Sequence, residues 1–134
     1  MTPALPTISA TVAALLGLLA ALLTARVIVL RVRFKVDAGD GGHAPLAQAI
    51  RAQSNFAELA PIAILLLTFA EWSIAWRWLI VGLGAALLIA RLASAWGLSH
   101  SLGPSQARQA GAGLTILVIV IASLLILYRG FVML

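Results

Sequence analysis

Long runs of apolar residues, interrupted by short polar segments, form the main pattern along this chain. A helix that crosses the roughly 30 Å hydrocarbon layer of a membrane needs about 20 residues at 1.5 Å rise per residue. Ile8 to Ala25 is uncharged over 18 residues and Ala110 to Tyr128 over 19, and a further apolar segment contains Arg91. The apolar window Leu59 to Ala70 has only 12 residues, so its helix must begin upstream, near Pro45, and carry polar side chains into the membrane. The pattern predicts four spans, at residues 6–32, 46–71, 76–98 and 108–130.

Short polar connections separate the predicted helices. The strongest turn signal is the segment Asp37 to Gly42, and further signals lie at residues 71–77 and 99–105. Each connection is too short to cross the membrane, so neighbouring helices must run in opposite directions. We therefore expect an all-α integral membrane protein, an up-down bundle of four transmembrane helices in which residues 1–134 form a single domain.

The composition excludes several classes of protein. Hydrophobic residues make up 63% of the chain and charged residues 10%, the mean hydropathy is +1.09, and there is no cysteine. A soluble domain carries about a quarter charged residues, so a soluble enzyme, a disordered tail and a disulfide-stapled module are all disfavoured. The net charge of +5 comes from basic residues scattered through apolar sequence, and nucleic acid is therefore not an expected partner.

The basic residues near the span ends predict the orientation. Those of the first and third connections, with their flanks, are Arg31, Arg33, Lys35 and Arg108, whereas the opposite side has Arg77 and Arg129. The positive-inside rule places both termini outside and the connections richer in cations in the cytoplasm. At the outer end, Trp72, Trp76 and Trp78 would then form an aromatic belt. A bacterial inner membrane, with periplasmic termini, is the expected location.

Rows of small residues predict how the helices associate. One row, in the first span, is Ser9, Ala13, Gly17, Ala21 and Ala25, and another, in the third span, is Gly82, Ala86, Ala90 and Ser94. Small residues four positions apart let helix backbones approach closely within lipid. General enrichment in alanine is the alternative explanation.

The second span carries a polar cluster into the membrane. At about 100° per residue, Arg51, Asn55 and Glu58 fall within an arc of roughly 60° on one helix face. Ile62 and Leu65 continue this face as an apolar stripe. Because a charge within a span costs about 2.5 to 3.5 kcal/mol on insertion scales, such residues are retained where they are paired or bind something. This face therefore predicts a site with an ionic head region and an apolar floor.

Further cations are expected at the same membrane level, namely Arg26, Arg31, Arg33, Arg91 and Arg108. Guanidinium groups match carboxylates in bidentate geometry and stay charged. An amphipathic anion is thus the natural ligand, with Glu58 available for its ammonium group. Two alternatives stay open: Arg51 and Glu58 could form an internal network bridged by Asn55, and the cations near residue 33 could act only as topology signals.

These residues also carry a family resemblance. The chain contains Arg31-x-Arg33-Phe34-Lys35-Val36, then Arg51-Ala52-Gln53-x-Asn55-x-x-Glu58-x-x-Pro61, then Arg91 in the third span. This pattern resembles the membrane-associated proteins in eicosanoid and glutathione metabolism, the MAPEG family, which includes microsomal glutathione transferases and leukotriene and prostaglandin synthases. The Gly-Asp-Gly-Gly loop before Arg51 is similar to that of bacterial members.

The resemblance implies a homotrimer of four-helix subunits that binds glutathione between neighbouring subunits. By motif match, the residues that would hold glutathione are Arg51, Gln53, Asn55, Glu58 and Arg91. Arg108 resembles the arginine that activates the thiol in leukotriene synthases, and Arg108 and Arg31 are the candidate catalytic residues. A guanidinium beside a thiol favours the nucleophilic thiolate, so the implied activity is transfer of glutathione to lipophilic electrophiles, or reduction of lipid hydroperoxides.

The sequence departs from the leukotriene synthases at several positions. Arg31-Val32-Arg33 replaces two consecutive arginines, and Ser94 and Leu98 replace tyrosines. A non-catalytic, lipid-binding or scaffolding member of the same fold is therefore an alternative. A small four-span drug exporter is less favoured, because such exporters usually carry their membrane carboxylate in the first span, whereas Glu58 is in the second, among cations that would repel cationic drugs.

Overall fold

The computed structural model describes residues 5–73, 76–100 and 106–132. It contains four long helices: α1 (Thr7–Phe34), α2 (Ala44–Ser73), α3 (Arg77–His100) and α4 (Gln106–Val132). All four are long and apolar enough to cross a membrane, which confirms the all-helical fold expected from the hydropathy pattern.

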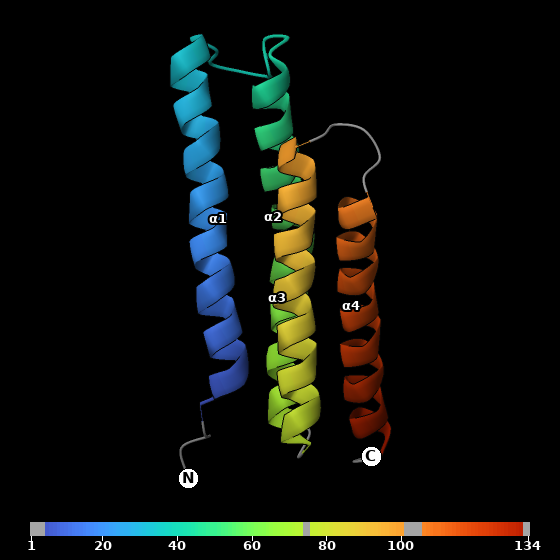
Figure 1. The fold of residues 1–134 in the computed structure, drawn as a ribbon. Helices are drawn as coiled ribbons and strands as arrows, with labels where there is room; N and C mark the ends of the chain where they lie inside the picture. The colour runs from blue at the N-terminus through green and yellow to red at the C-terminus, as the bar shows by residue number, and fades with distance from the viewer. Residues whose placement is uncertain (1–4, 74–75, 101–105, 133–134) are drawn as a thin grey trace.

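The helices run antiparallel to their neighbours in sequence, and the start of α1 and the end of α4 lie at the same end of the bundle (Figure 1). We call this the terminal end, and the opposite end, which holds the connection at residues 35–43, the loop end. Helices α2 and α3 lie against each other in the centre, and α1 and α4 each pack against both of them. Within the described residues α1 and α4 do not touch, so the bundle is flattened rather than square.

The inward face of α2 consists mainly of alanines. Its buried residues recur every three or four positions and include Ala52, Phe56, Ala60, Ala63 and Leu67. This spacing is the period of one helix face. Small side chains on it allow the neighbouring helices to approach α2 closely, as helix packing in lipid requires.

Large apolar side chains cover the outside of the bundle. Leu22, Ile89 and Leu124 are each more than half exposed, although a soluble protein would not leave so many of this kind in water. Trp72, Trp76 and Trp78 are exposed at the terminal end, where the sequence predicts an aromatic belt. The outer surface thus has the composition expected of a lipid-facing one.

The first connection begins at the end of α1. Lys35 adopts the left-handed conformation with φ 54°, and the Val36 N–H donates to Arg31 O at 3.0 Å, which is a helix-ending arrangement. Gly42 also has a positive φ, and its N–H donates to Asp40 Oδ1 at 2.9 Å. The glycine-rich segment is therefore the turn that the sequence predicts.

The second connection begins later than the sequence predicts. Residue 71 was expected in a turn, but α2 continues through Ser73. Glu71 instead accepts hydrogen bonds from Ile8 N at 2.9 Å, from Ser9 N at 2.7 Å and from the Ser9 hydroxyl. Because the N-cap residue of α1 is Pro6 and caps nothing with its side chain, Glu71 supplies the cap from another helix. The third predicted turn lies at 99–105: α3 continues to residue 100, and residues 101–105 lie outside the described ones.

The predicted row of small residues on α1 does not pack inside the subunit. Ser9 is buried, but Gly17 is exposed, with nothing within 4 Å of the position that a Cβ would take. A spacing of four residues drifts by about 40° per step around a helix, so the row winds away from the face that holds Val12 and Leu16. The bulkier residues of that face make the contact instead.

The row on α3 does make a close contact near its loop end. Ala90 and Ser94 are buried, and a Cβ at Gly111 of α4 would lie 2.6 Å from Ala90 O. No larger residue fits at position 111 without separating the two helices. This contact holds the start of α4 against the end of α3, beside the polar face of α2.

Candidate functional site

A cavity of about 140 Å³ lies at the loop end, where α2, α3 and α4 meet. Its walls come from one face of α2 and from one residue each of α3 and α4: Arg51, Ser54, Asn55, Glu58, Leu98 and Arg108. Four of the seven candidate site residues of the sequence therefore meet here, namely Arg51, Asn55, Glu58 and Arg108.

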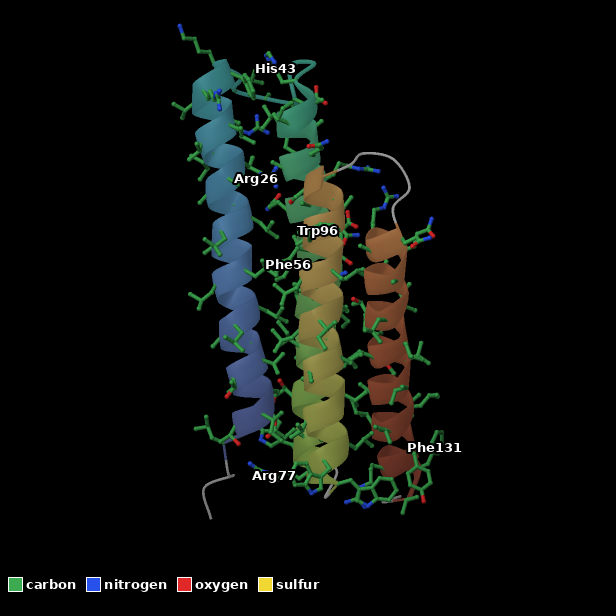
Figure 2. The ribbon with its side chains drawn as sticks, in the orientation of Figure 1. Arg26, His43, Phe56, Arg77, Trp96 and Phe131 are labelled. Carbon is green, nitrogen blue, oxygen red and sulfur yellow. The ribbon has the colours of Figure 1, made fainter. Side chains whose placement is uncertain are left out.

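Helix geometry places the α2 residues together. Ala52 and Phe56 point into the bundle and are buried, so the face that carries Arg51, Asn55 and Glu58 turns toward the cavity. Figure 2 labels Phe56, which marks this half of α2. The periodicity in the sequence was sufficient to predict this shared face.

The side chains of Arg51 and Glu58 do not form an ion pair with each other in the described part of the chain. Both are exposed, and within the described part of the chain no hydrogen bond or ion pair joins them. The internal network bridged by Asn55, which the sequence left open, is therefore not formed in this structure. The Glu58 carboxylate and the Arg51 guanidinium remain available at the cavity wall.

Arg91 lies behind the cavity rather than in its wall. Its side chain is 1% exposed. Nη1 donates to Asn55 O at 3.2 Å and to Asn55 Oδ1 at 3.3 Å, and Nη2 donates to Ser94 Oγ at 2.9 Å. Among the described residues, Asn55 is the cavity residue to which Arg91 donates, so the geometry of Arg91 is that of a positioning residue.

Two other candidates lie elsewhere in the single subunit. Arg31, in the last turn of α1, donates from Nη1 to Asp37 O at 3.0 Å and does not line the cavity. Gln53 lies two residues after Arg51, on roughly the opposite side of α2, and is half-buried. Arg26 donates to Ser99 O at 3.3 Å and so ties α1 to α3.

Ser54 and Leu98 line the cavity although they were not among the candidates. Ser54 could have been found from the sequence, because it lies four residues before Glu58, which places the two side chains about 40° apart around α2. Leu98 carries no polar group, and only the packing of α3 against α2 reveals its position. It gives the polar cavity one apolar wall.

The side chains that line the cavity suit an anionic ligand that also carries a positively charged group. The cavity lining contains two guanidiniums, one carboxylate, one side-chain amide and one hydroxyl. Guanidiniums recognise carboxylates bidentately, whereas Glu58 suits an ammonium group. Among residues 5–73, 76–100 and 106–132, no group of three His, Cys, Asp or Glu could hold a metal ion.

Known proteins are similar to this chain in sequence. Inner membrane protein YecN of Escherichia coli strain K12 is 40% identical over 95 residues, which cover 68% of this chain and 72% of YecN. The same values hold for Inner membrane protein YecN of Escherichia coli O6:H1. The model of the MAPEG family matches residues 9–128, a range that reaches into all four helices and includes every residue of the cavity. The chain therefore belongs to the MAPEG family.

Proposed function

We propose that this protein binds glutathione at the loop-end cavity and transfers it to lipophilic electrophiles. The observation that carries the proposal is the convergence of Arg51, Asn55, Glu58 and Arg108 on one cavity. Family membership supports it, since glutathione-related activity is a general property of that family.

Glutathione matches the charges of the cavity. It has two carboxylates and one amine, and the cavity offers two guanidiniums and one carboxylate. Arg51 and Arg108 would bind the carboxylates, and Glu58 the amine. Because Asn55 Oδ1 already accepts from Arg91, the NH₂ group of Asn55 is left to donate to the ligand.

The cavity of one subunit is too small for the whole ligand. Its volume is about 140 Å³, whereas ligand pockets occupy about 300 to 1,000 Å³. We propose that the protein is a homotrimer in which a neighbouring subunit completes each site. Arg31 and Gln53, which lie away from the cavity of their own subunit, are the candidate residues for the neighbour's contribution.

The proposed chemistry is nucleophilic attack by a thiolate. A free thiol is mostly protonated at neutral pH, and the positive charge of Arg108 would favour loss of its proton to solvent. The thiolate then forms a C–S bond to an electrophilic carbon, and the displaced electron pair leaves with a leaving group or is protonated from water. Because the cavity lies at the end of membrane helices, a lipophilic electrophile would arrive through the bilayer.

The proposed orientation follows the positive-inside rule. The loop end carries Arg31, Arg33 and Lys35 and would face the cytoplasm, where the cavity would meet glutathione. Both termini would then be periplasmic. The name of the similar Escherichia coli protein, an inner membrane protein, supports the bacterial inner membrane as the location.

Two residues favour a second candidate function, non-catalytic binding. Where the leukotriene synthases have tyrosines, this chain has Ser94, whose hydroxyl accepts from Arg91, and Leu98, which is buried. Neither can donate a phenolic hydrogen bond to a thiolate. If they matter for catalysis, the cavity would bind glutathione or a lipid without turnover.

Thermal unfolding of detergent-purified protein, with and without glutathione, tests the proposed site. At 100 times its dissociation constant, a ligand should stabilise the wild type by about 2.7 kcal/mol. Glu58→Gln and Arg51→Ala should reduce this stabilisation strongly, because each removes one charge that the ligand would meet. Arg33→Gln is the matched control: Arg33 is an exposed cation of the loop end outside the cavity. An equal response of the wild type and all three variants would contradict the site.

A further inference from the structure

A second concavity lies between α1 and α3 in the terminal half of the bundle, away from the proposed glutathione site. It is an open groove of about 370 Å³. Four residues of each helix line it: Thr7, Ile8, Thr11 and Val12 from α1, and Arg77, Val81, Ala85 and Leu88 from α3. The groove faces outward, between helices that cross the membrane.

The length of the groove matches one leaflet of a bilayer. Eleven positions separate Arg77 from Leu88 on α3, which corresponds to about 16 Å at 1.5 Å per residue. The hydrocarbon core is about 30 Å thick, so the groove extends from one membrane surface to near the midplane. Among the described residues that line the groove, Arg77 alone is charged, and it lies at the surface end. Figure 2 shows Arg77 at the terminal end of the bundle.

Packing between the two helices fixes the shape of the groove. At its floor, Val12 approaches α3 so closely that a Cβ at Gly84 would lie 2.9 Å from Val12 Cγ2. At its mouth, Glu71 holds the start of α1 through Ile8 and Ser9. These two contacts set the spacing between the walls of the groove.

The charge at the mouth is exposed to a ligand. Arg77 lies near enough to Glu71 for the two charges to interact, but it is exposed and within the described residues no ion pair joins it to Glu71. Both carboxylate oxygens of Glu71 already accept hydrogen bonds from the start of α1. The Arg77 guanidinium can thus meet an anionic group at the membrane surface, beside Trp76 and Trp78.

We propose that this groove is a binding site for an anionic phospholipid of the leaflet at the terminal end. One acyl chain lies along the apolar walls, and the headgroup phosphate contacts Arg77. The charge at one end and the apolar length of one leaflet argue for this occupant over a wholly apolar molecule. The site is independent of glutathione binding, because it shares no residue with the loop-end cavity.

Native mass spectrometry of the detergent-purified protein tests the proposal with two lipids that have identical acyl chains, phosphatidylglycerol and phosphatidylcholine. One basic residue near an anionic headgroup contributes about 1 kcal/mol, so the wild type should prefer phosphatidylglycerol about fivefold. Arg77→Gln should abolish this preference. Arg129→Gln is the matched control, since Arg129 is an exposed arginine of the same end outside the groove, and it should keep the preference.

A second pair of variants tests the acyl-chain part of the site and does not depend on Arg77. Ala85→Phe should fill the groove and weaken the binding of both lipids. Val120→Phe adds an aromatic ring to an exposed position of α4 at a similar depth, and should change neither. Retained preference in Arg77→Gln, or equal lipid binding in Ala85→Phe and the wild type, would overturn the proposal. So would disulfide crosslinking of subunits through Ala85→Cys in this cysteine-free chain, because a second copy would then cover the groove.

Discussion

Arg91 is a buried residue of α3 that contacts the proposed site through Asn55. Its guanidinium is buried, and among the described residues no carboxylate lies within ion-pair distance of it. Asn55 and Ser94 satisfy its two terminal nitrogens, while Nε has no hydrogen-bond partner in the described part of the chain. A buried charge in a membrane helix is costly. The hydrogen bond from Arg91 to Asn55 Oδ1 explains best why Arg91 is buried here, because it holds the Asn55 amide in one orientation at the cavity wall.

Arg108 is the residue on which the proposed chemistry depends. If its guanidinium stabilises the thiolate of bound glutathione, Arg108→Gln should lower the thiolate fraction at neutral pH several-fold. Removal of a nearby positive charge raises the pKa of the thiol. The ultraviolet absorbance of thiolate, titrated with glutathione, measures this fraction.

Arg33→Gln serves as the control for this experiment, because it removes a loop-end charge outside the cavity. A catalytic role for Arg108 requires both the thiolate signal and turnover of an electrophile to fall in the variant. Unchanged turnover in Arg108→Gln would contradict a catalytic role for Arg108. Glutathione binding without a thiolate signal and without turnover in the wild type would favour the non-catalytic function.

At the level of elements, the start of α1 depends on α2. The first N–H groups of a helix have no partner within the helix, and Pro6 provides no cap to α1. Glu71, in the last turn of α2, accepts from Ile8 N and Ser9 N and places negative charge at the positive end of the α1 dipole. This contact sets the position of α1 at the mouth of the groove.

Glu71→Ala should therefore destabilise the bundle. Loss of an N-cap costs about 0.5 to 2 kcal/mol, and thermal unfolding in detergent should show a lower Tm, by several degrees. Glu71→Gln, which keeps one acceptor without the charge, should fall between Glu71→Ala and the wild type. Thr11→Ala is the control, since the Thr11 hydroxyl donates to Thr7 O within α1 itself. Equal Tm values for Glu71→Ala and Thr11→Ala would contradict a cap across helices.

At the level of the whole molecule, the sequence predicts local periodicity well and contacts between helices poorly. The four helices and the shared face of Arg51, Asn55 and Glu58 follow from the spacing of apolar and polar residues along one helix. The cap at Glu71 could not be found this way, because it joins residues 62 and 63 positions apart. A weak signal existed: α1 begins without a capping side chain, and an up-down bundle places Glu71 at the same end.

The row of small residues on α1 is the reverse case: the sequence predicted a packing face that the helices of the single subunit do not use. Its spacing of four suggested a packing face, but the 40° drift per step carries Gly17 and Ala21 away from the inward side. In the single subunit this surface therefore stays uncovered. The proposed trimer is the assembly that would give it a partner, and it would also bring Arg31 and Gln53 of one subunit toward the cavity of another.

Calorimetric titration of the detergent-purified protein with glutathione and with glutathione diethyl ester tests the central claim most directly. Esterification removes both carboxylate charges and keeps the amine and the thiol, so it isolates the interaction assigned to Arg51 and Arg108. We predict that glutathione binds with at most one molecule per subunit and that the diester binds at least tenfold more weakly. Absence of binding by glutathione, or equal affinity for the two compounds, would contradict a carboxylate-binding site at the loop end.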